Sequence, residues 1–266
     1  MPPIKVVVQG ASGRMGREVM AALCRDSAIE PVGAVDIKAN EDYISLPDGL
    51  GLIPYARDLE PIIQRLHPHV VVDFSSAEGA LKAARIALKS GVALVVGTTG
   101  LAPAHVEEIS ELTRRYQVGA VIAPNFALGA VLMMHLAKLA ARYFDEAEVI
   151  ELHHDQKADA PSGTALATAR AMRESRGGPF KYAATTRETI PGTRGGQVDG
   201  IAIHSVRLQG LLAHQEVLFG GPGQTLSIRH DTISRECFMP GVLLAVKEVV
   251  KRQELVYGLE ALLKLS

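Results

Sequence analysis

The sequence predicts an α/β fold in which a doubly wound parallel sheet is followed by a smaller α+β domain with a mixed or antiparallel sheet. In the first half, short β-branched runs alternate with segments of helical periodicity, a pattern typical of a parallel sheet covered by helices on both faces. After about Asn125 the order changes, and three strand-like runs follow one another across short Gly/Pro turns. Right-handed crossovers then favour the doubly wound topology for the first half.

The elements of the first half follow from the apolar pattern. The expected strands are continuous apolar runs at Ile4–Val8, Val32–Val35, Val70–Phe74, Leu94–Val96 and Ala120–Ile122. The expected helices lie between or after them, at Gly13–Arg25, Leu59–Leu66, Glu78–Lys89 and Pro103–Tyr116.

The second half contains helices and strands in a different order. The expected helices are Leu128–Tyr143, Ser162–Arg176 and Met239–Lys251, the last of which is expected to pack back on the first domain. The expected strands are Ala147–Leu152, Gly200–Arg207, Gln215–Phe219 and Thr225–Arg229. The stretch Ala183–Gln197, rich in Gly, Thr and Arg, is interpreted as a long mobile loop. We therefore expect one domain from residues 1–125 and 239–266, and another from residues 126–238.

The composition narrows the class of protein. The chain has 266 residues, 47% of them hydrophobic, which is enough for a large core and for two domains. A formal net charge of -1, no Trp and 5% aromatic residues argue against nucleic acid or an anionic membrane as a partner. The isolated thiols of Cys24 and Cys237 favour a reducing compartment.

No segment of the sequence predicts export or a membrane span. The N-terminal apolar run is short and enters a glycine turn, unlike a signal peptide. The long apolar stretch Val118–Ala137 is interrupted by Pro, Asn, Gly and His residues, so it is interpreted as a strand, a loop and a helix. We expect a soluble, cytoplasmic protein.

A glycine motif directly follows the first expected strand: Gly10-Ala11-Ser12-Gly13-Arg14-Met15-Gly16. In this GxxGxxG spacing, glycines let backbone N–H groups approach a pyrophosphate at a helix N-terminus. Asp36 follows Gly16 by 20 residues, at the end of the second strand. A tight turn without a ligand is the alternative, but this context favours a Rossmann-like dinucleotide site.

Residues near this motif bear on the choice of cofactor. Asp36 would accept a hydrogen bond from a ribose 2′-OH, which favours NAD, whereas Lys38 could meet a 2′-phosphate or be a solvated surface lysine. Arg14 adds a cation beside the phosphates. Ligands bind at the carboxyl ends of such strands, where two loops lie: Gly97-Thr98-Thr99-Gly100 and Ala123-Pro124-Asn125-Phe126. The first loop could also be a simple strand-to-helix turn.

Proton-transfer and anion-binding groups gather in the run Glu148–Ala165, at and after the end of the expected strand Ala147–Leu152. His153 and His154 end the strand, and adjacent side chains of an extended chain point to opposite faces. Histidine suits proton transfer near neutral pH, and Lys157 offers a cation for a carboxylate or a second proton. Ser162 is expected to cap a helix that presents Gly163 and Thr164 to an anion.

Other uses of these histidines are less consistent with the sequence. Consecutive residues do not readily converge on one ion, so no metal site is expected at His153 and His154. A purely structural His-His pair is the alternative to the catalytic interpretation. The remaining candidates are expected to pack or lie on the surface: His135, His204, His214 and His230.

The combined motifs resemble those of the dihydrodipicolinate reductase family over nearly the whole chain. They are the glycine motif, Gly97–Gly100, Asn125-Phe126 and the segment from Glu151 through His153-His154 and Lys157 to Ser162-Gly163-Thr164. The resemblance implies reduction of 4-hydroxy-tetrahydrodipicolinate by NADH or NADPH in the diaminopimelate route to lysine. It also implies a homotetramer assembled through the sheet of the substrate-binding and oligomerisation domain.

The resemblance also implies roles for individual residues. His153 is similar to the general acid/base and Lys157 to a second proton donor and substrate ligand. His154, Gly163 and Thr164 would bind the substrate. Cofactor contacts would come from Gly10, Ala11, Ser12, Gly13, Arg14, Met15, Asp36, Lys38, Gly97, Thr98, Thr99, Ala123, Pro124, Asn125 and Phe126.

The chain departs from some family members at two places. Some members carry an arginine near the position of Ser76. Some also carry an arginine beside the acidic residue that binds the ribose, whereas here Asp36 is followed by Ile37 and Lys38. Use of either cofactor is therefore expected. The alternatives to this function are another Rossmann reductase of small amino or keto acids, such as one similar to aspartate dehydrogenase, and a regulatory protein that senses NAD(P) without turnover.

Overall fold

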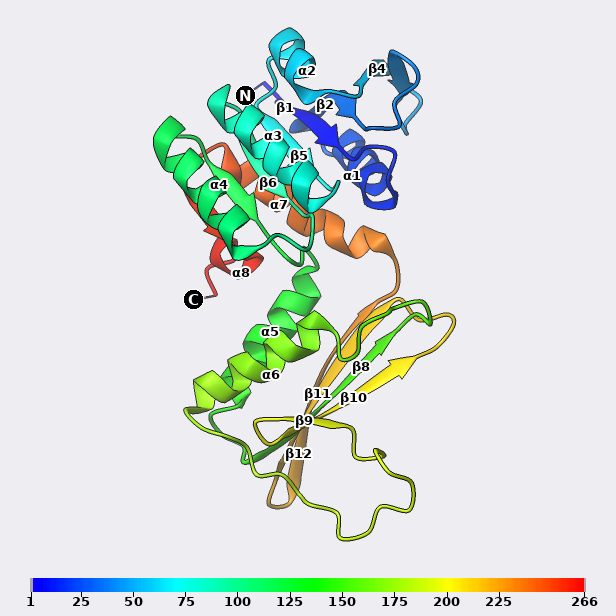
Figure 1. The fold of residues 1–266 in the computed structure, drawn as a ribbon, viewed down its shortest axis with the longest axis vertical. Helices are drawn as coiled ribbons and strands as arrows, with labels where there is room; N and C mark the ends of the chain where they lie inside the picture. The colour runs from blue at the N-terminus through cyan, green and yellow to red at the C-terminus, as the bar shows by residue number, and fades with distance from the viewer. Residues whose placement is uncertain (1, 266) are drawn as a thin grey trace. The chain divides into compact units, whose positions relative to one another are not determined.

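The structure is a computed structural model that describes residues 2–265, and its chain forms two compact units (Figure 1). Unit 1 extends to Ala127 and resumes at Arg235, whereas unit 2 comprises Leu128–Ser234. The helix α7 (Met239–Val249) thus belongs to the same unit as the glycine motif, because its apolar face packs on the first helix and on strands of that unit.

Unit 1 contains an eight-stranded sheet in the order β13-β7-β6-β5-β1-β2-β4-β3. All neighbouring strands are parallel except β3, which runs antiparallel to β4. The strands are β1 (Ile4–Gln9), β2 (Ile29–Val35), β3 (Tyr43–Ser45), β4 (Leu52–Ala56), β5 (Val70–Asp73), β6 (Ala93–Val96), β7 (Ala120–Ile122) and β13 (Leu255–Tyr257).

Helices cover both faces of this sheet, as the alternating pattern predicts. Besides α7, they are α1 (Arg14–Arg25), α2 (Leu59–Leu66), α3 (Ala77–Lys89), α4 (Pro103–Tyr116) and the short α8 (Leu259–Leu262), with a 3-10 turn at Arg235–Phe238. On one face α2, α3 and α4 lie in a row, and on the other α1 packs against α7 (Figure 1). The doubly wound fold is therefore confirmed.

Local sequence explains where several of these helices begin and end. The Ser76 hydroxyl accepts a hydrogen bond from Gly79 N at the start of α3, and Pro103 opens α4. The C-caps His67 and Gln117 adopt left-handed conformations that stop α2 and α4. Between α2–α4 and the sheet, an aliphatic core is buried that includes Val7, Val71, Leu88 and Leu94.

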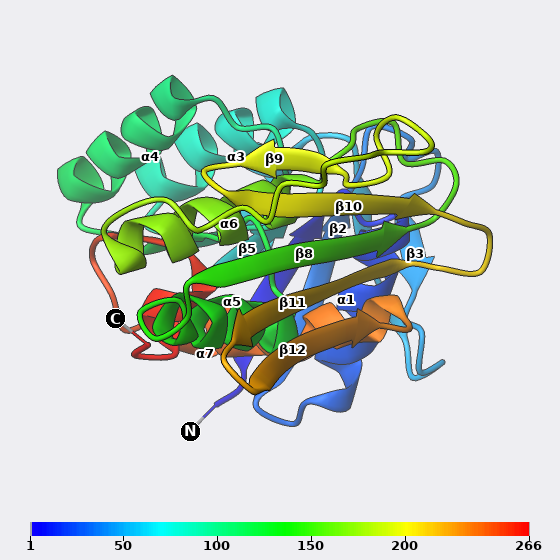
Figure 2. The same cartoon turned by 90° about the horizontal axis from the view of Figure 1, so that it is seen from below.

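Unit 2 contains a five-stranded mixed sheet in the order β12-β11-β8-β10-β9 (Figure 2). Its strands are β8 (Glu146–His153), β9 (Gly196–Val198), β10 (Ile201–Arg207), β11 (Ala213–Gly221) and β12 (Gln224–Thr232). Although β10 and β11 are successive, they do not pair: β8 lies between them, parallel to β10 and antiparallel to β11.

Two helices, α5 (Leu128–Ala140) and α6 (Gly163–Arg176), lie behind this sheet in the view of Figure 2. They bury the apolar side of the sheet around Val149, Met172, Ile203 and Phe219. No helix of residues 128–234 covers the opposite face of the sheet.

Three details of the sequence prediction were wrong. The loop expected at Ala183–Gln197 ends earlier, because Gly196–Val198 pairs with β10 as β9. The helix expected to reach Tyr143 ends at Ala140. The short strands β3, β4 and β13 were not foreseen, since a three- to five-residue strand carries little periodicity of its own. In the part of the chain that the structure describes, no helix is long and apolar enough to span a membrane.

Candidate active site

The glycine motif forms a tight turn between β1 and α1. Gly10 adopts a φ of +77°, and its N–H donates to Val35 O at 2.9 Å, which ties the turn to β2. A Cβ on Gly16 would lie 2.1 Å from Gly10 O, so no other residue fits there without a backbone shift. No side chain caps the N-terminus of α1, and its first turn carries no acidic residue. This helix end therefore suits an anion.

Asp36 lies at the end of β2 with its carboxylate beside the same turn. One oxygen accepts a hydrogen bond from Ser12 N at 3.0 Å, and the other accepts one from Lys38 N at 3.0 Å. Burial raises the pKa of Asp36, but these hydrogen bonds together hold it below its ordinary value. The side chain is thus a fixed anion at the place where a ribose hydroxyl would meet the motif.

Two cavities adjoin this turn. One, of about 310 Å³, is lined by the predicted cofactor residues Gly10, Gly13, Asp36 and Lys38, and also by Arg57 and Lys82, which were not predicted. The other, of about 460 Å³, is lined by Arg14, Met15, Phe74, Ser75, Gly97, Thr98, Thr99, Pro124, Asn125, Phe126 and Phe238. Both include Phe74 and Ser75. The uncapped N-terminus of α1, the carboxylate of Asp36 and these cavities fit a nicotinamide dinucleotide.

The predicted cofactor residues outside the cavity linings are Ala11 and Ser12 in the glycine turn and Ala123 directly after β7. Ser12 contacts Asp36, as described above, and its hydroxyl lies 2.9 Å from the Tyr55 hydroxyl. Ala11 and Ala123 are buried, and their N–H groups donate to Val35 O and Val96 O. Ala11 and Ala123 thus fix the backbone of their loops and do not present a side chain to the cavities.

Asp73, at the end of β5, is a polar residue whose role the sequence analysis missed. It is fully buried and accepts hydrogen bonds from Gln9 Nε2 at 2.7 Å, Ser75 Oγ at 2.8 Å and Thr98 Oγ1 at 2.6 Å. Burial raises its pKa, although these hydrogen bonds oppose the rise. Asp73 thus connects β1 to the Gly97–Gly100 loop. The available signal was a carboxylate that ends an otherwise apolar strand.

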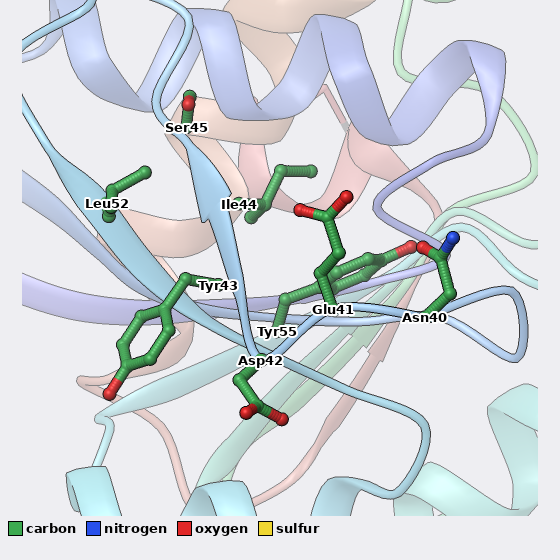
Figure 3. A pocket seen from close by; sticks show the side chains of 8 residues that line it. All are labelled: Asn40, Glu41, Asp42, Tyr43, Ile44, Ser45, Leu52 and Tyr55. Carbon is green, nitrogen blue, oxygen red and sulfur yellow. The ribbon is translucent and has the colours of Figure 1, made fainter.

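A third cavity, about 750 Å³ and open to solvent, lies along β3 and β4 (Figure 3). Its lining includes the acidic side chains of Glu41 and Asp42 and the ring of Tyr43, which points away from Tyr55. Tyr55 connects this cavity to the glycine turn through its contact with Ser12. No sequence motif assigns a ligand or a reaction to this cavity.

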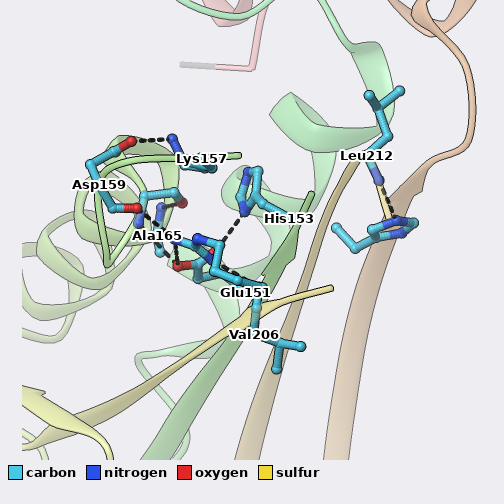
Figure 4. Close-up of polar contacts among 10 residues, drawn as sticks. Glu151, His153, Lys157, Asp159, Ala165, Val206 and Leu212 are labelled. Carbon is cyan, nitrogen blue, oxygen red and sulfur yellow. Dashed lines mark hydrogen bonds and ion pairs between the residues drawn. The ribbon is translucent and has the colours of Figure 1, made fainter. Parts of the chain in front are cut away.

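In unit 2, His153 lies at the end of β8 on the same face as Glu151 (Figure 4). Its Nδ1 lies 2.5 Å from Glu151 Oε2. Glu151 is fully buried, and Arg207 on β10 donates to both of its oxygens, at 3.0 and 2.8 Å. A buried carboxylate thus contacts Nδ1 of the histidine ring, and Nε2 lies on the side of the ring that faces away from Glu151.

The loop after β8 carries Lys157, whose Nζ lies 2.6 Å from Asp159 (Figure 4). The loop returns to the sheet at Ser162, whose N–H donates to Glu151 at 3.3 Å and whose hydroxyl caps α6 by accepting from Ala165 N at 3.2 Å. The predicted N-cap is confirmed. Gly163 is exposed, and a Cβ built there would meet no atom within 4 Å. The first turn of α6 is therefore open to an anion.

The electrostatics of this site depend on burial and on Arg207. Burial raises the pKa of Glu151, but hydrogen bonds from Arg207, Ser205 and His153 hold it below its ordinary value. Burial lowers the pKa of His153, which outweighs the opposing effect of Glu151. Glu151 is therefore ionised and His153 mostly neutral in the free protein at pH 7. His154 is partly exposed beside them.

The structure brings His153, Lys157 and the start of α6 together around one buried carboxylate. Arg207 was missed because it is separated from Glu151 by 56 residues, and only the pairing of β8 with β10 places it opposite His153. Other histidines have structural partners: His204 pairs with Glu148 and His214 with Asp231. Within residues 2–265, no group of three or more His, Cys, Asp or Glu residues is placed to hold a metal ion.

Comparison with known proteins identifies the family. Residues 4–126 match the model of the dihydrodipicolinate reductase N-terminus, and residues 129–263 match that of the C-terminus. The 4-hydroxy-tetrahydrodipicolinate reductases of Dehalococcoides mccartyi and Moorella thermoacetica are 55% and 52% identical to this chain, over 100% and 98% of both partners.

Comparison with solved structures supports the same family. The dipicolinate-bound dihydrodipicolinate reductase from Paenisporosarcina sp. TG-14 is 41% identical, with a TM-score of 0.87 over 97% of this chain and 99% of that one. The amine dehydrogenase of Mycobacterium smegmatis, 16% identical with a TM-score of 0.63 over 93% of this chain and 92% of its own, shares only the fold. From its two matched family models and its full-length relatives, the chain is an oxidoreductase that belongs to the dihydrodipicolinate reductase family.

Proposed function

We propose that this chain reduces 4-hydroxy-tetrahydrodipicolinate to tetrahydrodipicolinate in lysine biosynthesis, with a nicotinamide cofactor held in unit 1 and the dicarboxylate in unit 2. The observation that carries the proposal is the joint presence of His153 on its buried carboxylate, Lys157 and the open N-terminus of α6. A proton donor beside two groups that attract carboxylates is what reduction of a dicarboxylate imine requires.

Unit 1 residues would hold the cofactor. The glycine turn, from Gly10 to Met15, would bind the pyrophosphate, and Asp36 would bind a ribose. The loops Gly97–Thr99 and Ala123–Phe126 would surround the nicotinamide end of the 460 Å³ cavity. When bound, the reduced nicotinamide supplies a hydride.

Unit 2 residues would bind the substrate and deliver a proton. Gly163 N–H and the Thr164 N–H and hydroxyl, at the positive end of α6, would bind one carboxylate, and Lys157 with His154 would bind the other. His153 would deliver a proton from Nε2, with Lys157 as a second donor. The 4-hydroxyl group of the substrate would leave as water, so one hydride and one proton balance the conversion. The Paenisporosarcina reductase, whose structure has dipicolinate bound, supports a planar dicarboxylate as the ligand.

For the cofactor we propose use of both NADH and NADPH, with NADH at least as effective. The ionised Asp36 accepts a 2′-OH and repels a 2′-phosphate. Lys38 and Arg57 line the same cavity as Asp36, and their charges would offset that repulsion.

We also propose that the protein is a cytoplasmic homotetramer. The support for assembly is the face of the unit 2 sheet that no helix of that unit covers, where Ile150, Leu152 and Leu218 remain partly exposed. Light scattering after size exclusion would measure the mass of the assembly. A monomeric mass at micromolar concentration would contradict this part of the proposal.

The reaction is tested with purified protein in a coupled assay. Pyruvate and aspartate semialdehyde are condensed to supply the substrate, and loss of NADH or NADPH is followed by absorbance. Consumption should require both precursors, and no consumption with either cofactor would refute the proposal. His153→Gln should lower kcat by on the order of 10²-fold or more while cofactor affinity stays near that of the wild type.

The same assay separates the alternatives. A reductase of other amino or keto acids would oxidise the cofactor with those acids and not with the condensed precursors. A protein that only senses the cofactor would bind NADH without turnover. The names and full-length identities of the relatives favour the reductase.

A further inference from the structure

We infer that Glu151 and Arg207 are positioning residues that hold the proton of His153 on Nδ1 and thereby direct Nε2 to the substrate. The inference rests on the proposed role of His153 and assigns a function to two side chains that bind neither substrate nor cofactor in that proposal. It concerns unit 2 alone.

The first step is the set of hydrogen bonds to the Glu151 carboxylate. Oε1 accepts from Arg207 Nη2 at 2.8 Å and from Ser162 N at 3.3 Å. Oε2 accepts from Arg207 Nη1 at 3.0 Å and faces His153 Nδ1 at 2.5 Å. An ionised carboxylate only accepts hydrogen bonds, so the proton of this contact belongs to His153 Nδ1. The neutral ring is then a single tautomer with its lone pair on Nε2.

The second step concerns Arg207, which fixes the carboxylate and the loop at once. Arg207 Nη2 also donates to the carbonyl oxygen of Asp159 at 2.6 Å. Asp159 lies between Lys157 and Ser162 in the loop that joins β8 to α6, and this loop carries the proposed substrate ligands His154 and Lys157. One guanidinium therefore sets the position of the histidine, through Glu151, and the position of the loop.

The third step is energetic. Glu151 is fully buried and the Arg207 side chain is 19% exposed, and such a buried ion pair adds little net stability because desolvation offsets most of the attraction. A buried charge pair that ends on a ring nitrogen of the proposed proton donor is better explained by orientation of that ring.

The chain contains an internal comparison for this arrangement. On the opposite face of β8, Glu148 pairs with Arg194 at 2.6 Å and with His204 at 2.8 Å. The residue types are the same, but Glu148 is 34% exposed and its carboxylate does not contact the proposed proton donor. Glu148→Gln is therefore a matched control for Glu151→Gln.

The charged groups around His153 decide the sign of the expected pH effect. They are Glu151 on β8, Arg207 on β10 and Lys157 in the loop, whose partner is Asp159. Burial, Lys157 and Arg207 lower the pKa of His153, and Glu151 raises it. Replacing Glu151 by Gln removes the raising effect, so the pKa of His153 should fall further.

The experiment compares the full-length variants Glu151→Gln, Arg207→Lys, Glu148→Gln and His153→Gln. For Glu151→Gln we expect kcat to fall roughly tenfold or more, a part of what a positioned acid–base group contributes. The limb of kcat/KM that falls with rising pH should move to lower pH by roughly one unit. NADH affinity of Glu151→Gln should stay within about twofold of the wild type. Arg207→Lys should retain an intermediate kcat, because lysine keeps the positive charge but cannot donate two parallel hydrogen bonds to the carboxylate.

A second readout does not depend on turnover. In ¹⁵N-labelled protein, the ring of His153, assigned by comparison with His153→Gln, should show the Nδ1–H tautomer in the wild type and in Glu148→Gln, and a mixture in Arg207→Lys and Glu151→Gln. If Glu151→Gln does not fold, Arg207→Lys carries the same comparison.

The outcomes separate this inference from the proposed function. A pH profile and a tautomer in Glu151→Gln and Arg207→Lys that match those of Glu148→Gln would overturn the positioning role. Wild-type turnover in His153→Gln would overturn the proposed proton donor instead, while the tautomer measurement would still report whether Glu151 orients the ring.

Discussion

Gly163 offers a test that separates substrate binding from folding. It is the first residue of α6, it is exposed, and a Cβ built on it would meet no atom within 4 Å. Gly163→Ala therefore adds a methyl group without a clash inside unit 2. The methyl group would instead occupy the space at the helix start where the proposed carboxylate accepts backbone hydrogen bonds.

The magnitude follows from what the methyl group displaces. A hydrogen bond to a charged group contributes about 1.5–3 kcal/mol, so its loss should raise KM and the inhibition constant of pyridine-2,6-dicarboxylate roughly 10- to 100-fold. The same substitution should increase the free energy of unfolding, although it weakens binding. Alanine at a compatible glycine position adds about 0.4–1 kcal/mol, which corresponds to a Tm increase of at most about 4 °C for a chain of this size.

The assay combines steady-state kinetics, competition by pyridine-2,6-dicarboxylate and thermal unfolding. Gly178→Ala is the matched control, because a Cβ there also meets nothing within 4 Å and lies beyond the other end of α6. We expect the control to keep its KM and its inhibition constant. If Gly163→Ala binds substrate and inhibitor as the wild type does, the carboxylate site does not lie at this helix start.

Three further predictions concern other parts of the two units. Lys38→Ala should raise KM for NADPH and leave KM for NADH nearly unchanged; equal losses would place Lys38 outside the 2′-phosphate site. Gly16→Ala should cost about 1–3 kcal/mol of unfolding free energy and weaken NADH binding, because its Cβ would lie 2.1 Å from Gly10 O; normal unfolding and binding would contradict the geometry of the turn. Because burial lowers the pKa of His153 below its ordinary 6.5, kcat/KM should fall as pH rises through a midpoint below 6.5, where the imidazolium is lost; a midpoint above 7 would show that another group donates the proton.

The sequence predicted those features whose cause is local. The strands at the centre of unit 1 are continuous apolar runs, and the helices between them carry a repeating apolar face, so the parallel sheet could be inferred before any contact was known. The glycine turn could be inferred because its residues lie within one loop. The cap of α6 by Ser162 depends on residues three apart.

The features that were missed depend on pairing between distant segments. Successive β-runs favour a hairpin, yet β8 separates β10 from β11 because its apolar face fits between theirs beneath α5 and α6. The strand β13 exists because Leu255–Tyr257 pairs with the edge strand β7, and three residues carry no periodicity that would reveal it.

For the candidate site, the sequence determined which groups are present and the tertiary structure decided how they are oriented. His153, Lys157 and Gly163 lie within eleven consecutive residues, so the sequence alone places them in one segment. The carboxylate that holds the histidine and the arginine that holds the carboxylate belong to different strands. Their contact depends on the register in which Arg207 lies opposite His153, and register is set by burial of whole sheet faces, which no local pattern contains.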